Sequence, residues 1–128
     1  MSENNYYPSE SELEILQVLW EEEPATVRTV HEALAREKDV GYTTTLKQMQ
    51  RMLEKGVLRR IEKGRVHYYQ TAVKGPAVRQ SLLQRLLKNA FGGSAVELAL
   101  HALGQSRPGL EELEELERLI QQKKKEQK

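Results

Sequence analysis

The sequence contains no cysteine among its 128 residues. This absence excludes disulfide bonds, thiol catalysis and thiolate metal sites. The sequence also lacks an apolar run of about 18 residues, the length at which a membrane span is predicted, so no membrane insertion is expected. The first ten residues, MSENNYYPSE, lack the basic region followed by an apolar stretch that marks a secretion signal. We therefore expect a soluble cytoplasmic protein.

Charge is divided unevenly along the chain, although the net charge is only +1. Residues 1–40 carry 3 basic and 10 acidic side chains, and residues 93–128 carry 6 basic and 7 acidic ones. The segment between them, residues 41–92, carries 11 basic and 2 acidic side chains and is called the basic block below. Such a block favours a polyanionic partner. The alternative is a solvated face that is balanced by the acidic first segment.

Local signals in the first half predict three helices. Ser9 and Glu12 have the spacing of a capping box at the start of the first helix, which ends before Pro24. Thr26 is the candidate cap of the second helix. The third helix is expected from about Thr43 to Gly56, a glycine suited to a helix C-terminus.

The second half is predicted to contain a hairpin and three more helices. The segment VLRRIEKGRVHYYQTAV reads as two short strands around a turn at Lys63-Gly64. Helical spacing then returns in GPAVRQSLLQRLLKNAF, in AVELALHALG and in LEELEELERLIQQKKKEQK, the last with a frayed lysine-rich end. The whole is mainly α with a small β-hairpin.

The third predicted helix begins with three threonines, which are mediocre helix formers. At about 100° per residue, its core stripe is Leu46, Met49 and Leu53, with Glu54 to one side. The opposite face carries only hydrogen-bond donors: Thr43, Thr44, Lys47, Gln48 and Arg51. Small hydroxyls can approach phosphates, and the longer side chains can reach base edges. This face favours double-stranded DNA as a partner; the alternative is that Thr43 is only a cap and the rest an ordinary surface.

The hairpin adds Lys63 and Arg65 at its tip, where they could rest on phosphates. Three helices followed by a basic-tipped hairpin are the order of a winged helix-turn-helix domain, expected over residues 1–73. Residues 74–128 are then a C-terminal helical dimerisation domain, because leucine stripes this wide must be buried somewhere. The alternative is that they pack on the first domain. The candidate dimerisation residues are Val78, Leu82, Leu83, Leu86, Leu87, Leu113, Leu116 and Ile120.

Several segments resemble the penicillinase-repressor (BlaI/MecI-type) family of winged-helix transcription regulators. SESELEILQVLW is similar to the opening helix of the family, with Glu14 and Trp20 in the expected places. YTTTLKQMQRMLEKGVL resembles its recognition helix, and RVHYYQTAV resembles the outgoing strand of its wing. FGGSAVELAL and LEELERLI resemble its dimerisation helices. The resemblance spans nearly the whole chain.

The resemblance implies a homodimeric repressor on a palindromic operator, with Thr43, Thr44, Lys47 and Arg51 in the major groove. In the best-studied members a membrane-bound sensor protease signals β-lactam exposure, and the repressor is cut at an Asn-Phe bond. The matching segment here, AVELALHALG, contains no Asn-Phe pair, which leaves the inducing signal open. The copper-responsive branch carries clustered C-terminal cysteines, and their absence here argues against copper-thiolate sensing.

Two other classes of function are alternatives to DNA binding. A winged-helix adaptor that binds proteins without specific DNA binding is the first alternative, since a fold does not dictate function. The outer face of the third helix disfavours it, because that face is neither acidic nor apolar. An enzyme is poorly supported: His31, His67 and His101 lack metal-ligand spacing, and no cofactor or metal is expected.

Overall fold

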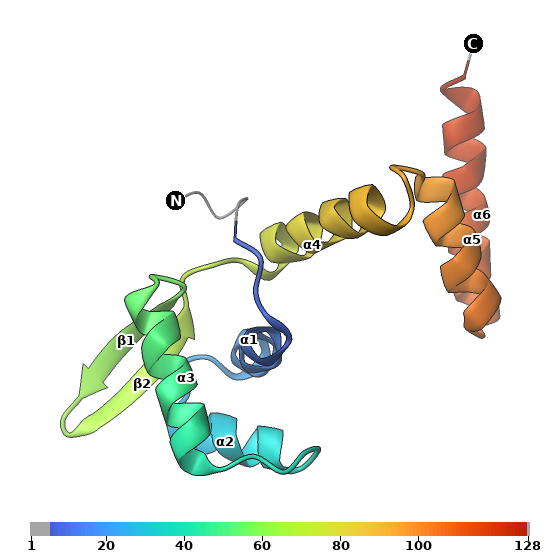
Figure 1. Ribbon diagram of the computed structural model, residues 1–128. Coiled ribbons are helices and arrows are strands. Elements are labelled where there is room, and N and C mark those ends of the chain that lie inside the picture. Colours follow the sequence, from blue (N-terminus) through green and yellow to red (C-terminus); the bar gives the residue numbers. More distant parts are fainter. Residues whose placement is uncertain (1–5, 128) are drawn as a thin grey trace. The chain divides into compact units, whose positions relative to one another are not determined.

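The computed structural model describes residues 6–127, and both predicted domains include some residues outside this range. Six helices and one hairpin follow one another within these residues (Figure 1). The prediction of a mainly helical chain with a small hairpin is confirmed. The elements are α1 (Glu10–Glu22), α2 (Val27–Ala35), α3 (Tyr42–Glu54), β1 (Leu58–Lys63), β2 (Val66–Thr71), α4 (Gly75–Ala90), α5 (Ala95–Gln105) and α6 (Leu110–Lys125).

Side-chain caps begin the first two helices, as predicted. The Ser9 hydroxyl accepts a hydrogen bond from the Glu12 amide at 3.2 Å, and the Ser9 amide donates to the Glu12 carboxylate at 2.8 Å. The Thr26 hydroxyl accepts from the Thr29 amide at 3.1 Å. These bonds satisfy amide groups that have no partner inside the helix.

Helix α3 ends at the predicted glycine. Gly56 has a positive φ of 83°, which glycine adopts without steric cost. The Gly56 amide donates to the Leu53 carbonyl at 3.0 Å, and the Val57 amide donates to the Met52 carbonyl at 3.0 Å. This is the Schellman pattern, and it turns the chain directly into β1.

Strands β1 and β2 form an antiparallel hairpin in which Leu58 pairs with Thr71 and Lys63 with Val66. The two loop residues are therefore Gly64 and Arg65, one position later than the predicted Lys63-Gly64 turn. Gly64 has a φ of 65° and Arg65 a negative φ, as in a type II′ turn, and this turn suits the twist of the strands.

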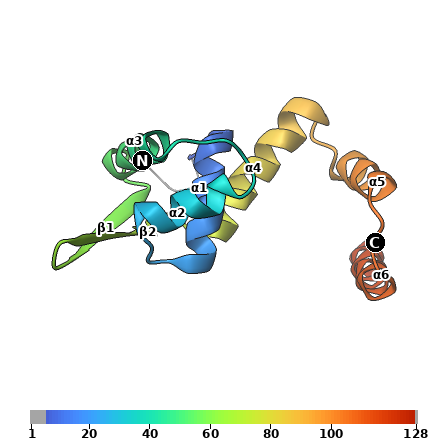
Figure 2. The same cartoon turned by 90° about the horizontal axis from the view of Figure 1, so that it is seen from below.

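The hairpin is tied to the helices through its second strand. Ala25, between α1 and α2, exchanges two backbone hydrogen bonds with Tyr69 on β2, at 2.9 and 2.7 Å. The tip of the hairpin, in contrast, projects past α1, α2 and α3 in both views (Figures 1 and 2). The fold thus holds the base of the hairpin and leaves its tip free to reach a partner.

The core lies among α1, α2, α3, the hairpin and the first turns of α4. The buried residues of α3 are Thr45, Met49 and Met52, whereas Leu46 and Leu53 are only partly buried. Of the predicted stripe of Leu46, Met49 and Leu53, only Met49 is fully buried, and the two leucines pack at the edge of the core. The apolar pattern alone did not show that Met52 and Thr45 are the residues buried beside Met49.

The chain divides into two compact units between Gln84 and Arg85, so the first unit includes the start of α4 beyond the predicted boundary at residue 73. Val78 is completely buried in this first unit, and Leu82 packs against the same core. Both were expected at a dimer interface. Val78 has no surface left for a partner, because residues of its own chain surround it.

The second unit contains the end of α4 with α5 and α6. The Ser94 hydroxyl caps α5 by accepting from the Glu97 amide at 3.1 Å. Helix α6 continues through Lys123, Lys124 and Lys125, so the predicted fraying of its lysine-rich end is not seen in the described residues. No helix within residues 6–127 is long and apolar enough to cross a membrane.

Candidate nucleic-acid interface

The outer face of α3 is polar and exposed. Thr43, Thr44, Lys47 and Arg51 lie on it as predicted, and each is exposed to solvent. Gln48 is half-buried at the edge of this face. Gln50 is exposed on the face instead. The shift follows from the burial of Met52, which turns the helix relative to the expected stripe. Gln50 was missed in the sequence for the same reason.

The same rotation affects the one acidic residue of α3. With the buried face centred on Thr45, Met49 and Met52, a projection at about 100° per residue places Glu54 on the outer face, close to Lys47. Glu54 is exposed, at the C-terminal end of the helix. The outer face is thus basic and hydroxylated over its first turns and acidic only at its last residue.

The N-terminus of α3 has no side-chain cap. Its N-cap residue is Gly41, whereas α1, α2 and α5 are each capped by a serine or threonine hydroxyl. The first turn of α3 also carries no acidic residue. Its free amide groups and the positive end of the helix dipole therefore stand beside the hydroxyls of Thr43 and Thr44, an arrangement suited to an anion.

The third threonine of the run has a different role. Thr45 is 1% exposed, and its hydroxyl lies 3.4 Å from Nδ1 of His31 on α2. His31 also meets the ring of Tyr42 edge-on, with centroids 5.6 Å apart. The guanidinium of Arg28, on α2, lies 5.9 Å from the centre of the Tyr42 ring. These contacts hold the start of α3 against α2, so Thr45 packs while its two neighbours face outward.

Lys63 and Arg65 are exposed at the end of the hairpin, as predicted. The ammonium of Lys63 lies 5.7 Å from the centre of the Tyr68 ring on the opposite strand. An aromatic face attracts a cation and holds it without neutralising its charge. Arg65 follows Gly64 in the turn itself, so the hairpin presents two positive charges at its tip.

The basic residues of these surfaces are not neutralised. Within residues 6–127, no ion pair joins Lys47, Arg51 or Arg65 to a carboxylate. Elsewhere lysines are paired: Lys38 contacts Glu14 at 2.6 Å, and Lys55 contacts Glu12 at 2.7 Å. Lys47, Arg51 and Arg65 are therefore exposed positive charges without a carboxylate partner in the described residues, and such charges attract polyanions.

The second unit exposes apolar side chains instead. No residue of α5 or α6 is buried within the chain. Leu87 and Leu116 are half-buried, and the other candidates from Leu83 onward are exposed. Val96 and Leu100 on α5 and Leu110 on α6, which the sequence analysis left out, are among the most exposed apolar residues. Within the part of the chain that is described, the leucine stripes of this unit lack a cover. The exposed apolar residues of this unit are Leu86, Val96, Leu100, Leu103, Leu110, Leu113, Leu119 and Ile120, and Leu83, in the first unit, is exposed as well.

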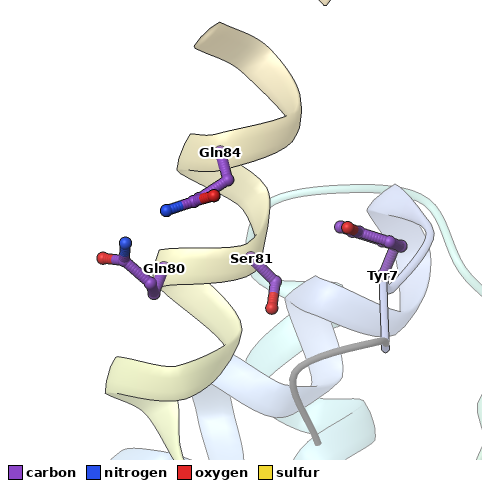
Figure 3. Close-up of a pocket in the computed structure, with 4 residues that line it drawn as sticks. All are labelled: Tyr7, Gln80, Ser81 and Gln84. Atoms are coloured by element: carbon purple, nitrogen blue, oxygen red, sulfur yellow. The ribbon is translucent and has the colours of Figure 1, made fainter. Parts of the chain in front are cut away.

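A small cavity of about 270 Å³ lies in the first unit between the N-terminal segment and α4. In Figure 3 the Tyr7 side chain points toward α4, which carries the other lining residues, Gln80, Ser81 and Gln84. None of the four carries a charge at neutral pH. Among the described residues, no group of three His, Asp or Glu side chains could hold a metal ion.

The three helices, the paired hairpin and the exposed basic face define a winged helix-turn-helix protein. A MarR family protein from Bacillus stearothermophilus has the same kind of fold, with a TM-score of 0.55 and 20% identity over 95% of this chain and 76% of that one. Residues 8–122 match the penicillinase repressor family, and the chain belongs to it.

Two relatives carry names that bear on function. The transcriptional regulator BlaI of Mycobacterium tuberculosis (strain H37Rv) is 33% identical over 112 residues, which are 83% of this chain and 77% of that protein. The methicillin resistance regulatory protein MecI of Staphylococcus aureus (strain N315) is 20% identical over 96% of this chain and all of that protein. Family and relatives indicate a transcriptional repressor of the BlaI/MecI type, which is not an enzyme.

Proposed function

We propose that the chain is a homodimeric repressor that binds a palindromic operator in the cytoplasm. In each protomer α3 enters the major groove, and the hairpin tip rests on the adjacent phosphates. Thr43, Thr44 and the free amide groups of α3 contact phosphate oxygens, while Lys47, Gln50 and Arg51 reach base edges. Gln48 lies at the rim of the contact. Lys63 and Arg65 supply sequence-independent affinity.

The single observation that carries this proposal is the uncompensated positive charge on the outer face of α3. Lys47 and Arg51 stand one turn apart on an exposed helix, beside an uncapped N-terminus and without a carboxylate partner in the described residues. When side chains of this kind neutralise DNA phosphates, cations condensed on the DNA are released, and this release favours binding.

The second unit supports the dimer. Its leucines are exposed in the isolated chain, and Leu100 is 62% exposed. Helices with apolar faces of this width are stable only when another surface covers them. A second copy of the same unit supplies an identical face, and two-fold pairing of that kind is the commonest way in which soluble proteins associate. The dimer then matches the two halves of a palindrome.

The test is a footprint of the purified chain on the DNA upstream of its own gene, across a salt series. We expect two protected half-sites related by two-fold symmetry, with affinity that falls linearly in the logarithm of salt concentration. Weak protection without a pattern, lost by physiological salt, would favour the adaptor function instead.

A membrane sensor protease system acts on some members of the family, and the resemblance extends that partner to this chain. We leave cleavage at an Asn-Phe bond out of the proposed function, because each asparagine in the sequence is followed by Asn, Tyr or Ala. Induction of this repressor then requires another signal or another bond.

A further inference from the structure

One of the three basic residues in the acidic first segment, residues 1–40, stands apart from the carboxylates around it. Lys38 is paired with Glu14 at 2.6 Å, and Arg36 lines a groove together with three glutamates. Arg28, in the first turn of α2, is exposed and has no carboxylate within ion-pair distance in the described residues. Its charge is therefore available to a partner outside the chain.

Arg28 contacts the ring of Tyr42, the first residue of α3. Its guanidinium carbon lies 5.9 Å from the centre of that ring. Glu32, one turn further along α2, has the spacing of a helical ion pair, but the structure, which describes both side chains, joins Glu32 and Arg28 by no ion pair. A carboxylate would neutralise the guanidinium, whereas an aromatic face attracts it and leaves its charge in place.

The ring of Tyr42 is itself fixed from the side of the core. The loop after α2 returns the chain so that α3 begins beside α2 (Figure 1). There the ring of His31 meets the Tyr42 ring edge-on, with centroids 5.6 Å apart and an interplanar angle of 83°. Nδ1 of His31 lies 3.4 Å from the hydroxyl of the buried Thr45. A chain of contacts thus runs from the core through His31 and Tyr42 to the guanidinium of Arg28.

Arg28 stands where a helix-turn-helix protein meets the DNA backbone. In such proteins the first helix of the pair crosses the backbone while the second helix enters the major groove. With α3 as the second helix, α2 is the first, and Arg28 lies in its first turn beside the start of α3. An exposed guanidinium at this place has the charge and the reach to pair with a phosphate at the edge of the groove.

We propose that Arg28 contacts a backbone phosphate and that Tyr42 is a positioning residue, which holds the guanidinium of Arg28 in place before DNA arrives. The inference rests on the proposed function, because it assumes that α3 enters the major groove. A long side chain that is ordered only on binding loses conformational freedom at that moment. The ring of Tyr42 removes part of this cost, since it restrains Arg28 in the free protein.

The experiment measures affinity by fluorescence anisotropy across a salt series. The probes are a duplex that carries the footprinted operator and an unrelated duplex of the same length. The full chain is compared with Arg28→Ala, Tyr42→Leu, Tyr42→Phe and the double variant Arg28→Ala, Tyr42→Leu. Arg36→Ala is the matched control, because it removes an exposed arginine from the other end of α2. Circular dichroism melts check that each variant is folded.

We expect Arg28→Ala to bind both duplexes more weakly and to make the salt slope shallower by about 1 for each protomer. Tyr42→Leu should weaken binding by about two- to tenfold with nearly the same slope, because the cation remains but is no longer held. Tyr42→Phe keeps the ring and should bind as wild type does. The double variant should bind no more weakly than Arg28→Ala alone, because Tyr42 acts through Arg28.

Three results would overturn the inference while leaving the proposed function intact. A salt slope in Arg28→Ala that equals the slope of Arg36→Ala would exclude the phosphate contact. Losses that simply add in the double variant would show that Tyr42 does not act through Arg28. Equal losses in Tyr42→Phe and Tyr42→Leu would assign the effect to the hydroxyl instead of the ring. A wild-type chain that binds neither duplex would contradict the proposed function itself.

Discussion

Glu12, in the first turn of α1, is an acidic residue that is only 3% exposed. Its carboxylate accepts from the Ser9 amide and contacts the ammonium of Lys55 at 2.7 Å. Lys55 is the C-cap of α3. The pair therefore ties the start of α1 to the end of the helix that we propose to enter DNA.

Glu12→Ala should lower the free energy of unfolding by about 1.5–3 kcal/mol, the usual contribution of a hydrogen bond to a charged group. This substitution removes both the hydrogen bond from the Ser9 amide and the ion pair with Lys55. The control is Glu10→Ala, which removes an exposed carboxylate from the same turn and should change stability by less than about 0.5 kcal/mol. Urea unfolding followed by circular dichroism measures both values.

The contribution of Glu12 should depend on pH. Burial raises the pKa of this carboxyl, but the hydrogen bonds and charge of Lys55, together with the hydrogen bonds of Ser9, outweigh burial and hold the pKa below its ordinary value. A depressed folded-state pKa stabilises the fold above the unfolded value and loses that effect as the pH falls through the folded one. The stability difference between wild type and Glu12→Gln should shrink as the pH is lowered from neutral through the lowered pKa of this carboxyl. A difference that grows toward acid would contradict the ion pair.

Tyr6 lies beside the same carboxylate. Burial raises the pKa of the Tyr6 hydroxyl far above its ordinary value, and the negative charge of Glu12 raises it further. Tyr6 therefore stays neutral over the whole range in which Glu12 titrates. The pH dependence above belongs to the carboxylate and not to the phenol.

Arg51→Ala should weaken operator binding by about 1–3 kcal/mol and relax the sequence preference at one position of each half-site, if the guanidinium pairs with guanine. Arg36→Ala, an exposed arginine at the end of α2, is the control and should leave the preference unchanged. Competition binding with every single-base operator variant gives the answer. A uniform loss over all sequences would reassign Arg51 to the phosphates.

At the scale of elements, the boundaries of α1, α2 and α3 were predictable because each depends on residues close in sequence. Ser9 with Glu12, Thr26 and Gly56 act within one turn of the chain, so their spacing alone fixes where a helix begins or ends. The face that α3 buries was less predictable. Thr45 is buried in the core, where its hydroxyl contacts His31 on α2, and a contact with another helix cannot be read from the pattern of α3 alone.

The hairpin is the second element that the sequence predicted only in part, because the position of its turn depends on how β1 and β2 pair. The pairing of Lys63 with Val66 leaves Gly64 and Arg65 as the two turn residues. The sequence alone did not decide this, because Gly64 could be the second residue of a Lys63-Gly64 turn or the first residue of a Gly64-Arg65 turn. The register also makes Lys63 the last residue of β1, paired with Val66, and its ammonium reaches diagonally to the Tyr68 ring. Arg65 is consequently in the turn itself, at the point of the hairpin farthest from the helices.

Lys63→Ala should reduce affinity about equally on all DNA sequences and make the salt slope shallower by about 1, the contribution of one phosphate contact. Lys125→Ala, at the end of α6, should leave the slope unchanged. Fluorescence anisotropy at four salt concentrations, on the operator and on unrelated DNA, provides the slopes. A change of sequence preference in Lys63→Ala would count against its place in the wing.

At the scale of the whole molecule, the leucine pattern of α4 predicted burial but not what each residue is buried against. Val78 and Leu82 face the core of their own chain, while Leu83 and Leu86 are exposed on the same helix. Helical periodicity reports which residues share a face. It cannot separate intrachain packing from a protein interface, since both select the same side chains.

The double variant Leu100→Glu, Ile120→Glu should yield monomers, because it places two charges on apolar side chains that are exposed in the single chain. Folding of the first unit should be unaffected, and affinity for the two-half-site operator should fall by about a hundredfold or more as the linked second contact is lost. Glu115→Gln, on the polar side of α6, is the control. Monomers that bind the full operator as tightly as wild type would contradict the dimer.

No residue of α5 or α6 is buried within the chain, so the stability and DNA binding of the proposed repressor should depend on its own concentration. Helices that are covered only by a second copy gain their stability by mass action, so their melting temperature should rise with protein concentration. Where monomers predominate, halving the amount of chain lowers the dimer about fourfold. Dilution through growth, or modest degradation, would then release the operator over a narrow range of repressor level without any ligand.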